Sequence, residues 1–161
     1  NLLNNSLTYA GESLEVELEV DAQTGQVELL KLVVVNDSGR VINPQTVSGQ
    51  VIGSVVHTLG NTLFEWMGYD GQAQPLTTTF ADYLLPTAPD IPHIEIKMLE
   101  YLGANNPLGV KGAGETACIP VPGAVISAIE NALEPFGVRL AEFPLSPARL
   151  FELINSQSSG H

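Results

Sequence analysis

Glu115 lies in a loop that is dense in glycine, within NPLGVKGAGETACIPVPGAVISAIENAL, residues 106–133. The neighbouring glycines remove side chains, so a bulky group could approach the carboxylate, which could then act as a general base. The same carboxylate could instead accept backbone N–H hydrogen bonds at the positive end of the following helix, an interaction of about 0.3 to 1 kcal/mol. The residue types alone leave both interpretations open.

The same loop also matches G-x-G-x-x-A, the fingerprint of dinucleotide-binding modules, through Gly112, Gly114 and Ala117. That fingerprint requires a strand that runs directly into the glycine turn, whereas about ten residues separate the predicted strand IEIKMLEY from Gly112. Pro120 and Pro122 also delay the start of the helix, and a carboxylate at this position would repel a pyrophosphate. We therefore reject a dinucleotide-binding module.

Two other side chains could bind a metal. His57 has no histidine or cysteine three or four residues away, so we expect an ordinary core or surface histidine. Cys118 is the only cysteine, and we expect it to be a small, buried residue rather than a ligand. A single cysteine excludes an internal disulfide and an iron–sulfur cluster held by this chain alone, and it fits a reducing, cytoplasmic compartment.

Hydrophobic periodicity predicts the elements that must position the loop. The alternation in GESLEVELEV, the turn DAQTG and the apolar stretch 27–35 predict a β-hairpin, with Glu15, Glu17 and Glu19 on the solvated outer side of an edge strand. Apolar residues at three- and four-residue steps from Val51 to Met67 predict a helix.

Three glycines lie in or beside this predicted helix, at positions 49, 53 and 60, where each is unfavourable in a helix interior. We expect another backbone or a ligand to approach closely there. Residues 72–92 should cross the body of the protein and lie against it, because FADYLLPTA has too many large apolar groups to remain solvated.

The rest of the chain alternates between strand, loop and helix. IEIKMLEY predicts a strand, VPGAVISAIENALEPFG a helix with Pro122 in its first turn and Gly137 after its end, and SPARLFELI a short helix capped by Ser146. We expect one domain over residues 1–154 and a polar, mobile tail over 155–161. The fold class is α+β: a β-hairpin and mixed strands packed with two main helices and a short C-terminal helix.

Composition limits the partners. The 161 residues include 6 Lys plus Arg against 18 Asp plus Glu, so the formal net charge of −12 repels nucleic acid and anionic membranes. No apolar run approaches the roughly 18 to 20 residues of a membrane span. The chain begins with Asn1 rather than Met, and we expect a processed product or a piece of a larger protein.

Several long motifs carry a resemblance to a known family. They are DSGRVINPQTVSGQVIGSVVHTLG, FADYLLPTAPDIPHIEI and the glycine-loop segment, with VDAQTGQV ahead of them and LSPARLFELI behind. Their order and spacing resemble those of the molybdenum hydroxylases: xanthine dehydrogenase, aldehyde oxidase and aerobic carbon monoxide dehydrogenase. The resemblance runs from about Glu12 to Ile154 and points to the carboxy-terminal part of the molybdopterin-binding domain of the large subunit.

The resemblance implies specific roles for the loop residues. Glu115 would be the general base in a water-derived hydroxylation of an aromatic heterocycle, an aldehyde or a similar carbon centre, and Gln50 would hydrogen-bond the pterin. Gly112, Ala113 and Gly114 would lie close to the cofactor, with Lys111 as a neighbour. Family members usually have two glycines where this chain has residues 53 and 54, and the serine at 54 should be accommodated.

The resemblance also implies cofactors and partners. The cofactor would be molybdenum-molybdopterin, which can carry a cytosine dinucleotide, while [2Fe–2S] and FAD would belong to partner subunits or domains. The partners would be the remainder of the large subunit, the iron–sulfur and flavin subunits and a small-molecule substrate, in a dimeric enzyme. No residue of this chain is expected to ligate the metal, and the isolated chain should be inactive. A non-catalytic assembly or scaffold module that kept the fold is the alternative.

Overall fold

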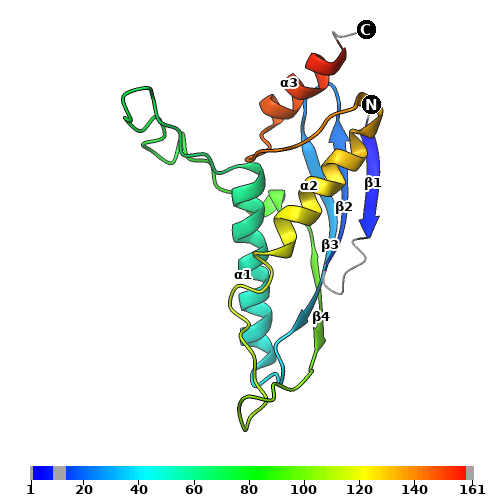
Figure 1. The fold of residues 1–161 in the computed structure, drawn as a ribbon, viewed down its shortest axis with the longest axis vertical. Coiled ribbons are helices and arrows are strands. Elements are labelled where there is room, and N and C mark those ends of the chain that lie inside the picture. Colours follow the sequence, from blue (N-terminus) through cyan, green and yellow to red (C-terminus); the bar gives the residue numbers. More distant parts are fainter. Residues whose placement is uncertain (1, 9–13, 159–161) are drawn as a thin grey trace.

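The computed structural model of the protein describes residues 2–8 and 14–158, with side chains from residue 14 to residue 156. The described strands form one sheet in the order β1-β2-β3-β4: β1 (Leu2–Thr8), β2 (Leu14–Asp21), β3 (Val27–Asp37) and β4 (Ile94–Leu99). The first three strands are antiparallel neighbours, whereas β4 pairs with β3 in parallel, so the sheet is mixed (Figure 1). This confirms the predicted α+β class.

The predicted hairpin is β2 and β3. Its turn is closed by a 2.7 Å hydrogen bond from the Gly25 N–H to the Asp21 carbonyl oxygen. Gly25 has φ +73°, and a Cβ there would lie 2.1 Å from the carbonyl oxygen of Pro147, so only glycine fits. The alternation of β2 is also confirmed, because its apolar residues are buried and its glutamates are half-buried.

The position of β2 in the sheet differs from the prediction. β2 lies between β1 and β3 and is not an edge strand. Residues 2–8 carry too weak an alternation to be recognised as the strand that covers this edge. Glu15 on β2 forms a diagonal ion pair with Lys31 on β3, with 2.9 Å between the Glu15 carboxylate and the Lys31 ammonium.

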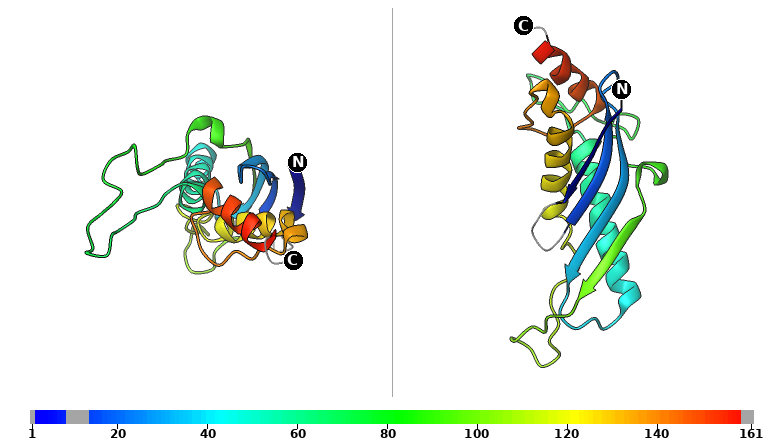
Figure 2. Two further views of the ribbon diagram at one scale, coloured as in Figure 1. Left: turned by 90° about the horizontal axis from the view of Figure 1, so that it is seen from above. Right: turned by 90° about the vertical axis from the view of Figure 1, so that its right-hand side faces the viewer.

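Two long helices cover one face of the sheet (Figure 2). α2 (Pro120–Ala132) packs on β1 and β2, and α1 (Pro44–Leu63) packs on α2 and β4. A shorter helix, α3 (Pro147–Ser158), follows, and two single 3₁₀ turns, η1 (Ala88–Asp90) and η2 (Glu134–Phe136), complete the described elements. The core between sheet and helices is formed by fully buried residues: Val16, Leu18, Val20, Leu32, Val51, Val55, Leu59, Val121, Val125 and Ile129. Each such side chain contributes about 1.5 to 3 kcal/mol relative to exposure.

The bounds of α1 differ from the predicted Val51–Met67. The helix begins after Asn43, whose side-chain oxygen accepts a 3.0 Å hydrogen bond from the Thr46 N–H. It ends at Leu63, so Met67 lies beyond it, and Ile52 is exposed rather than on the buried face. Polar residues at the start of the helix hid its first two turns from a search for apolar periodicity.

The three glycines of α1 separate into two groups. Gly60 is buried, and a Cβ there would lie 2.4 Å from Glu65 Oε1 and 3.0 Å from Pro86 Cδ, so its neighbours are close, but they are side chains and not the expected backbone or ligand. Gly49 and Gly53 are exposed, and no described atom lies within 4 Å of a Cβ at either position. The expected approach of another backbone is therefore wrong for these two glycines within the described chain.

Residues 66–85, here called the arm, project from the body instead of lying against it (Figure 1). Phe80 is 82% exposed, and Leu76, Leu84 and Leu85 are at least half exposed. The expectation that FADYLLPTA would be buried is therefore wrong. The apolar residues do form a cluster of large side chains, but the described chain supplies no surface to cover them.

The C-terminal elements largely follow the prediction. Pro122 lies in the first turn of α2, and Gly137 follows η2 with φ +67°. Ser146 caps α3, with its Oγ accepting a 3.3 Å hydrogen bond from the Arg149 N–H. Because α3 continues to Ser158, residues 155–158 of the expected tail are helical, and residues 159–161 lie outside the described residues. None of the described helices is long and apolar enough to cross a bilayer.

Candidate functional site

The glycine loop belongs to the long segment between β4 and α2, which turns at one end of the molecule and then runs along α1 (Figure 1). Its first part is fixed to the end of β3. The Lys111 N–H donates to the Ser38 carbonyl oxygen at 2.9 Å, and the Arg40 N–H donates to the Gly109 carbonyl oxygen at 3.0 Å. Gly39 has φ +61°, and a Cβ there would lie 2.2 Å from the Gly109 carbonyl oxygen, so the two backbones can approach only because this residue is glycine.

Asp37 strengthens this attachment with its side chain. Its Oδ2 lies 2.5 Å from Lys111 Nζ, and its Oδ1 accepts hydrogen bonds from the N–H groups of Gly39, at 3.0 Å, and Tyr101, at 3.1 Å. The hydrogen bond from Lys111, followed by that from Gly39, lowers the pKa of the Asp37 carboxyl below its ordinary value. The residue before Gly112 is therefore held by an ionised carboxylate.

The sequence analysis did not single out Asp37. The only available signal was an acidic residue at the end of a strand, directly before a Ser-Gly turn. Its partners are a lysine and a tyrosine N–H far along the chain, and no spacing rule connects them.

The second part of the loop lies against α1. A Cβ at Gly114 would lie 3.6 Å from Gln50 Oε1, so two of the predicted site residues are neighbours. One helical turn further along α1, the Cys118 Sγ lies 3.7 Å from the Ser54 carbonyl oxygen. Gln50 is exposed in the second turn of α1 rather than at the helix start, which corrects the expected position.

Ser54 and Cys118 have structural roles in this contact. Ser54 is buried, and its hydroxyl donates a 2.9 Å hydrogen bond to the Val51 carbonyl oxygen within the helix, so the serine is accommodated as expected. Cys118 is half-buried against the helix. His57 is exposed, and no group of three or more His, Cys, Asp or Glu side chains that could hold a metal occurs among the described residues.

The surface beside this contact is lined by glycine. A Cβ at Gly112 would meet no described atom within 4 Å, as at Gly49 and Gly53 of α1. Gly112, Gly114 and Glu115 are exposed, and Ala113 is half-buried. Gly49 and Gly53 on the helix and Gly112 and Gly114 on the loop therefore present backbone without a side chain, which leaves room for a bulky group at these positions.

The Glu115 side chain has no hydrogen bond or ion pair with any described residue. Its backbone carbonyl accepts a 3.1 Å hydrogen bond from the Cys118 N–H, which forms a turn before α2. α2 begins at Pro120, its N-cap Ile119 has no side-chain hydrogen bond, and its first turn contains no acidic residue. Among the described residues, the carboxylate therefore makes none of the contacts that the helix-terminus interpretation requires.

Thr116 is a further residue that the sequence analysis missed. Its Oγ1 is buried and has no hydrogen-bond partner among the described residues. Such a group costs about 1 to 3 kcal/mol unless a ligand or water satisfies it.

The α+β framework thus places the Gln50 amide next to Gly114, with the Glu115 carboxylate and the Thr116 hydroxyl following in the same loop. The family "Molybdopterin cofactor-binding domain" matches residues 4–92. The chain therefore belongs to this family, and it is homologous to the molybdenum-binding subunits of molybdenum hydroxylases.

Two curated relatives come from Paenarthrobacter nicotinovorans. The chain is 37% identical over 150 residues to the 6-hydroxypseudooxynicotine dehydrogenase complex subunit gamma, covering 92% of this chain and 19% of the relative. It is 42% identical over 140 residues to the nicotine 6-hydroxylase large subunit, covering 87% of this chain and 17% of the relative. The chain thus spans less than a fifth of the length of these relatives.

The crystal structure of quinoline 2-oxidoreductase from Pseudomonas putida 86 contains the same fold. It superposes with a TM-score of 0.85 at 39% sequence identity over 88% of this chain and 18% of that chain. The fold of the described residues is therefore that of the corresponding part of a molybdenum hydroxylase.

Proposed function

We propose that this chain is the part of a molybdenum hydroxylase that binds the molybdopterin cofactor and supplies the catalytic base, Glu115. One observation carries the proposal: Gly114 and Gln50, two positions far apart in the sequence, lie side by side on a glycine-lined surface next to a carboxylate without a partner in the described chain. A scaffold that had lost catalysis would not need to keep an unpaired carboxylate beside that surface.

The residues present fit the cofactor. A pterin carries both hydrogen-bond donors and acceptors, and the Gln50 amide offers both. Glycines at 49, 53 and 112 leave space that any side chain would fill. The buried Thr116 hydroxyl and the backbone groups of the loop supply further hydrogen-bonding capacity.

When bound, molybdenum-molybdopterin supplies the electron-accepting centre and the activation of water for hydroxylation. In this chain, a carboxylate oxygen of Glu115 would accept a proton from the activated water. Gln50 would orient the pterin, and residues 112–114 would set how closely the cofactor approaches the loop. The ion pair between Asp37 and Lys111 holds the loop at the end of β3. General-base action of this kind contributes about 10² to 10⁴ in rate.

The substrate class we propose is an aromatic nitrogen heterocycle, with aldehydes and similar carbon centres as the wider range. The names of the relatives support this, because they refer to nicotine, 6-hydroxypseudooxynicotine and quinoline. One relative is a subunit of a dehydrogenase complex, and we propose that this chain likewise acts with the remainder of a large subunit and with iron–sulfur and flavin subunits in a dimeric enzyme.

The binding part of the proposal can be tested separately from catalysis. Gln50→Ala in the assembled enzyme removes the amide proposed to bind the pterin, and we expect molybdenum per protomer to fall by about tenfold, as for loss of a buried polar contact. Gln45→Ala is the matched control, since Gln45 is an exposed glutamine on the same helix. Equal molybdenum content in both variants would contradict the assignment of Gln50.

A further inference from the structure

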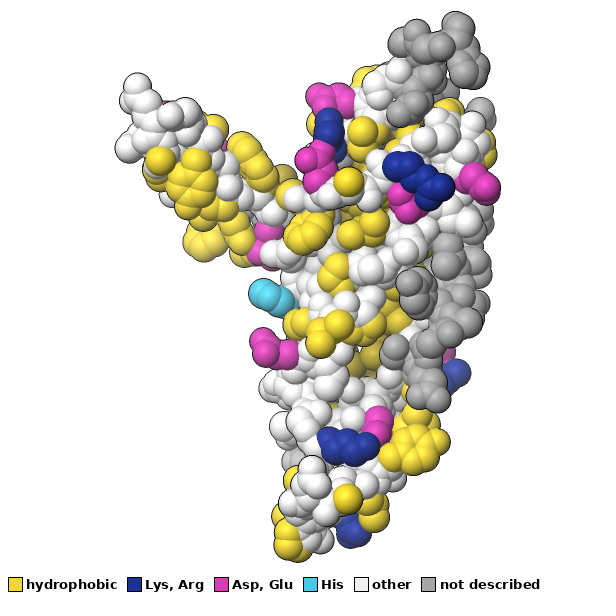
Figure 3. Space-filling model, in the orientation of Figure 1, with side chains coloured by type: hydrophobic (Ala, Val, Ile, Leu, Met, Phe, Trp, Pro, Cys, Tyr) yellow, Lys and Arg dark blue, Asp and Glu magenta, His cyan; other side chains and the backbone are white. Residues whose placement is uncertain are grey.

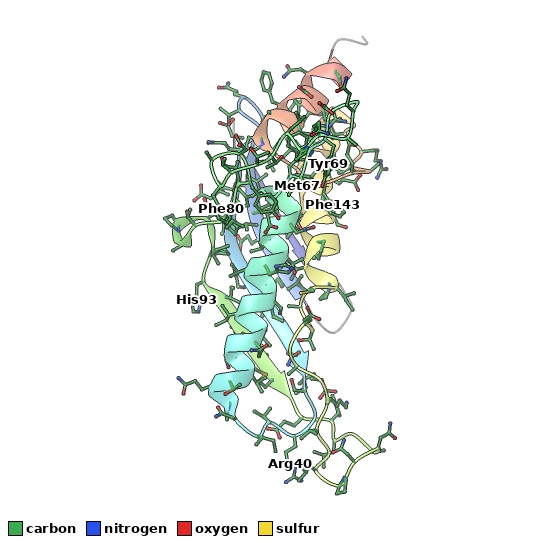
Figure 4. All side chains as sticks on the ribbon, turned by 90° about the vertical axis from the view of Figure 1, so that its left-hand side faces the viewer. Arg40, Met67, Tyr69, Phe80, His93 and Phe143 are labelled. Atoms are coloured by element: carbon green, nitrogen blue, oxygen red, sulfur yellow. The ribbon has the colours of Figure 1, made fainter. Side chains whose placement is uncertain are left out.

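The arm concentrates exposed apolar side chains in one projecting segment. Seven of the sixteen exposed large apolar residues of the described chain fall within its 20 residues, each at least half exposed: Trp66, Met67, Tyr69, Leu76, Phe80, Leu84 and Leu85. Figure 3 shows hydrophobic side chains along the projection, and Figure 4, in which the arm points toward the viewer, labels Met67, Tyr69 and Phe80. Isolated exposed apolar residues are ordinary, but a cluster of this density marks an interaction surface.

The arm is held in shape by its own hydrogen bonds. The Leu76 N–H donates to the Gly68 carbonyl oxygen at 2.8 Å, and the Gly68 N–H donates to Thr77 Oγ1 at 3.1 Å, where Thr77 is buried. The Trp66 ring lies over Gly68, because a Cβ there would fall 2.0 Å from a ring carbon. A preformed element loses less conformational entropy on binding than a flexible loop, which favours docking.

The charges of the arm indicate what kind of partner it fits. Residues 66–85 contain no Lys or Arg, and the two acidic residues accept hydrogen bonds within the arm. Asp70 Oδ1 accepts from the Gln72 N–H at 2.8 Å, and Asp82 Oδ2 accepts from the Thr79 hydroxyl at 2.9 Å. A surface without cations lacks the electrostatic attraction that binds phosphate groups of a membrane or a nucleic acid, so it fits an apolar polypeptide surface better.

A groove lies where the arm joins the body. It has a volume of about 400 Å³, and its lining mixes apolar with polar and charged residues: Phe64, Trp66, Leu84, Phe143 and Pro144, together with Asp82, Glu142, Ser146 and Arg149. Figure 3 shows the notch between the arm and the body, with hydrophobic side chains along the arm and acidic and basic side chains on the body wall that faces it. The groove lies at the end of α1 away from Gln50, about 20 Å along the helix axis, so it is separate from the glycine-lined surface.

We propose that the arm is a docking element that inserts its exposed apolar side chains into the remainder of the large subunit, with a segment of that polypeptide occupying the groove at its base. The identity of the docking partner rests on the proposed function, in which this chain is part of a large subunit. In quinoline 2-oxidoreductase the matched region is 18% of the chain, so 82% of that polypeptide lies outside it and can supply the covering surface. A second copy of this chain is the competing occupant.

Photo-crosslinking identifies the occupant directly. Phe80→p-benzoylphenylalanine is introduced into the assembled enzyme, which is irradiated and digested, and the crosslinked peptides are identified by mass spectrometry. The result expected is a crosslink to large-subunit sequence outside these 161 residues. A crosslink to a second copy of the arm, a crosslink only to another subunit, or no crosslink in enzyme whose assembly is verified would each overturn the proposal.

Substitution gives a second, quantitative test. Phe80→Ser and Leu84→Ser should each reduce the yield of assembled enzyme by about tenfold, the loss typical of a central aromatic or aliphatic anchor. Gln72→Ser, a polar change on the same arm, should leave the yield unchanged. Equal yields for all three variants would contradict the docking role. Molybdenum per protomer is measured on the fraction of enzyme that does assemble. A reduced yield of assembled enzyme with normal molybdenum in that fraction separates this inference from the proposed function.

Discussion

The Asp37 carboxylate and the Lys111 ammonium lie 2.5 Å apart and connect the end of β3 to the residue that precedes Gly112. The pair is partly exposed, with 26% and 38% of the two side chains accessible, so it contributes less to global stability than to the local position of the loop. A site on a loop is only as well defined as the contacts that hold the loop, and here those contacts come from a strand far away in sequence.

Removing this charge should loosen the glycine loop. Asp37→Asn weakens the bond to Lys111, and we expect amide hydrogen exchange over residues 109–118 to accelerate by about two- to fivefold, the factor that corresponds to a partly exposed ion pair. Glu15→Gln breaks the comparable pair with Lys31 on the sheet and is the control. Exchange in the loop that is the same in both variants would contradict the role of Asp37.

The pH dependence of this effect has a defined sign. The folded-state pKa of Asp37 is lowered, chiefly by the Lys111 hydrogen bond. The stabilisation from Asp37 is therefore fully present above the unfolded-state pKa of about 3.9 and is lost as the pH falls through the lower folded-state pKa. The difference in loop exchange between the wild type and Asp37→Asn should disappear over that acidic range.

If the cofactor lies against the glycine-lined surface, adding a methyl group there should reduce cofactor binding but hardly change the stability of the chain. Gly114→Ala places a methyl 3.6 Å from Gln50 Oε1, an ordinary contact, so the free energy of unfolding should change by about 1 kcal/mol or less. In the assembled enzyme the same methyl occupies space proposed for the cofactor, and molybdenum per protomer should fall about tenfold, as for overpacking of a filled site.

Gly123→Ala is the matched control for this test. Gly123 is exposed on α2, and no described atom lies within 4 Å of a Cβ there. Ala at this helical position should stabilise the chain by about 0.5 to 1 kcal/mol and leave molybdenum unchanged. Full molybdenum content in Gly114→Ala would show that no bound group approaches the loop at that position.

Tyr83 and Glu65 connect the base of the arm to the end of α1. The Tyr83 hydroxyl donates to Glu65 Oε2, and this hydrogen bond, followed by burial, raises the pKa of Tyr83 above its ordinary value. Its stabilisation is therefore fully present below the unfolded-state pKa of about 10 and is lost as the pH rises through the higher folded-state pKa.

Spectrophotometric titration measures this directly. The difference in phenolate absorbance between the 161-residue chain and its Tyr83→Phe variant isolates the ionisation of Tyr83, and we expect a midpoint above 10. Tyr101→Phe, at an exposed position, controls for the loss of one tyrosine. A Tyr83 midpoint at or below 10 would argue against the hydrogen bond to Glu65.

Local sequence signals predicted the elements that bury their own apolar faces. The alternation of β2, the turn at Gly25, the proline in the first turn of α2 and the Ser146 cap are each encoded within a few residues, and the structure confirms them. The start of α1 was missed because its first turns are polar. β1 was missed because residues 2–8 lack a clear alternation.

Long-range relationships could not be predicted in the same way. The motif resemblance selected Gln50 and Gly114 separately, but only the fold shows that they are neighbours. Asp37 was missed because its ion pair depends on tertiary structure, and Thr116 was missed because an orphaned hydroxyl has no sequence signature. The arm was predicted to lie against the body because its apolar content predicts burial. Apolar content does not identify which surface buries the side chains.

The measurement that tests the account most directly is the rate of substrate-dependent reduction of the molybdenum in the Glu115→Gln enzyme. Glutamine keeps the size and hydrogen-bonding capacity of glutamate but removes its basicity, and Glu134→Gln, at an exposed glutamate outside the site, is the control. We predict unchanged molybdenum per protomer, an unchanged thermal midpoint and a reduction rate lowered by about 10² to 10⁴ in Glu115→Gln alone. Near-normal reduction by the Glu115→Gln enzyme at full molybdenum content would contradict the catalytic assignment.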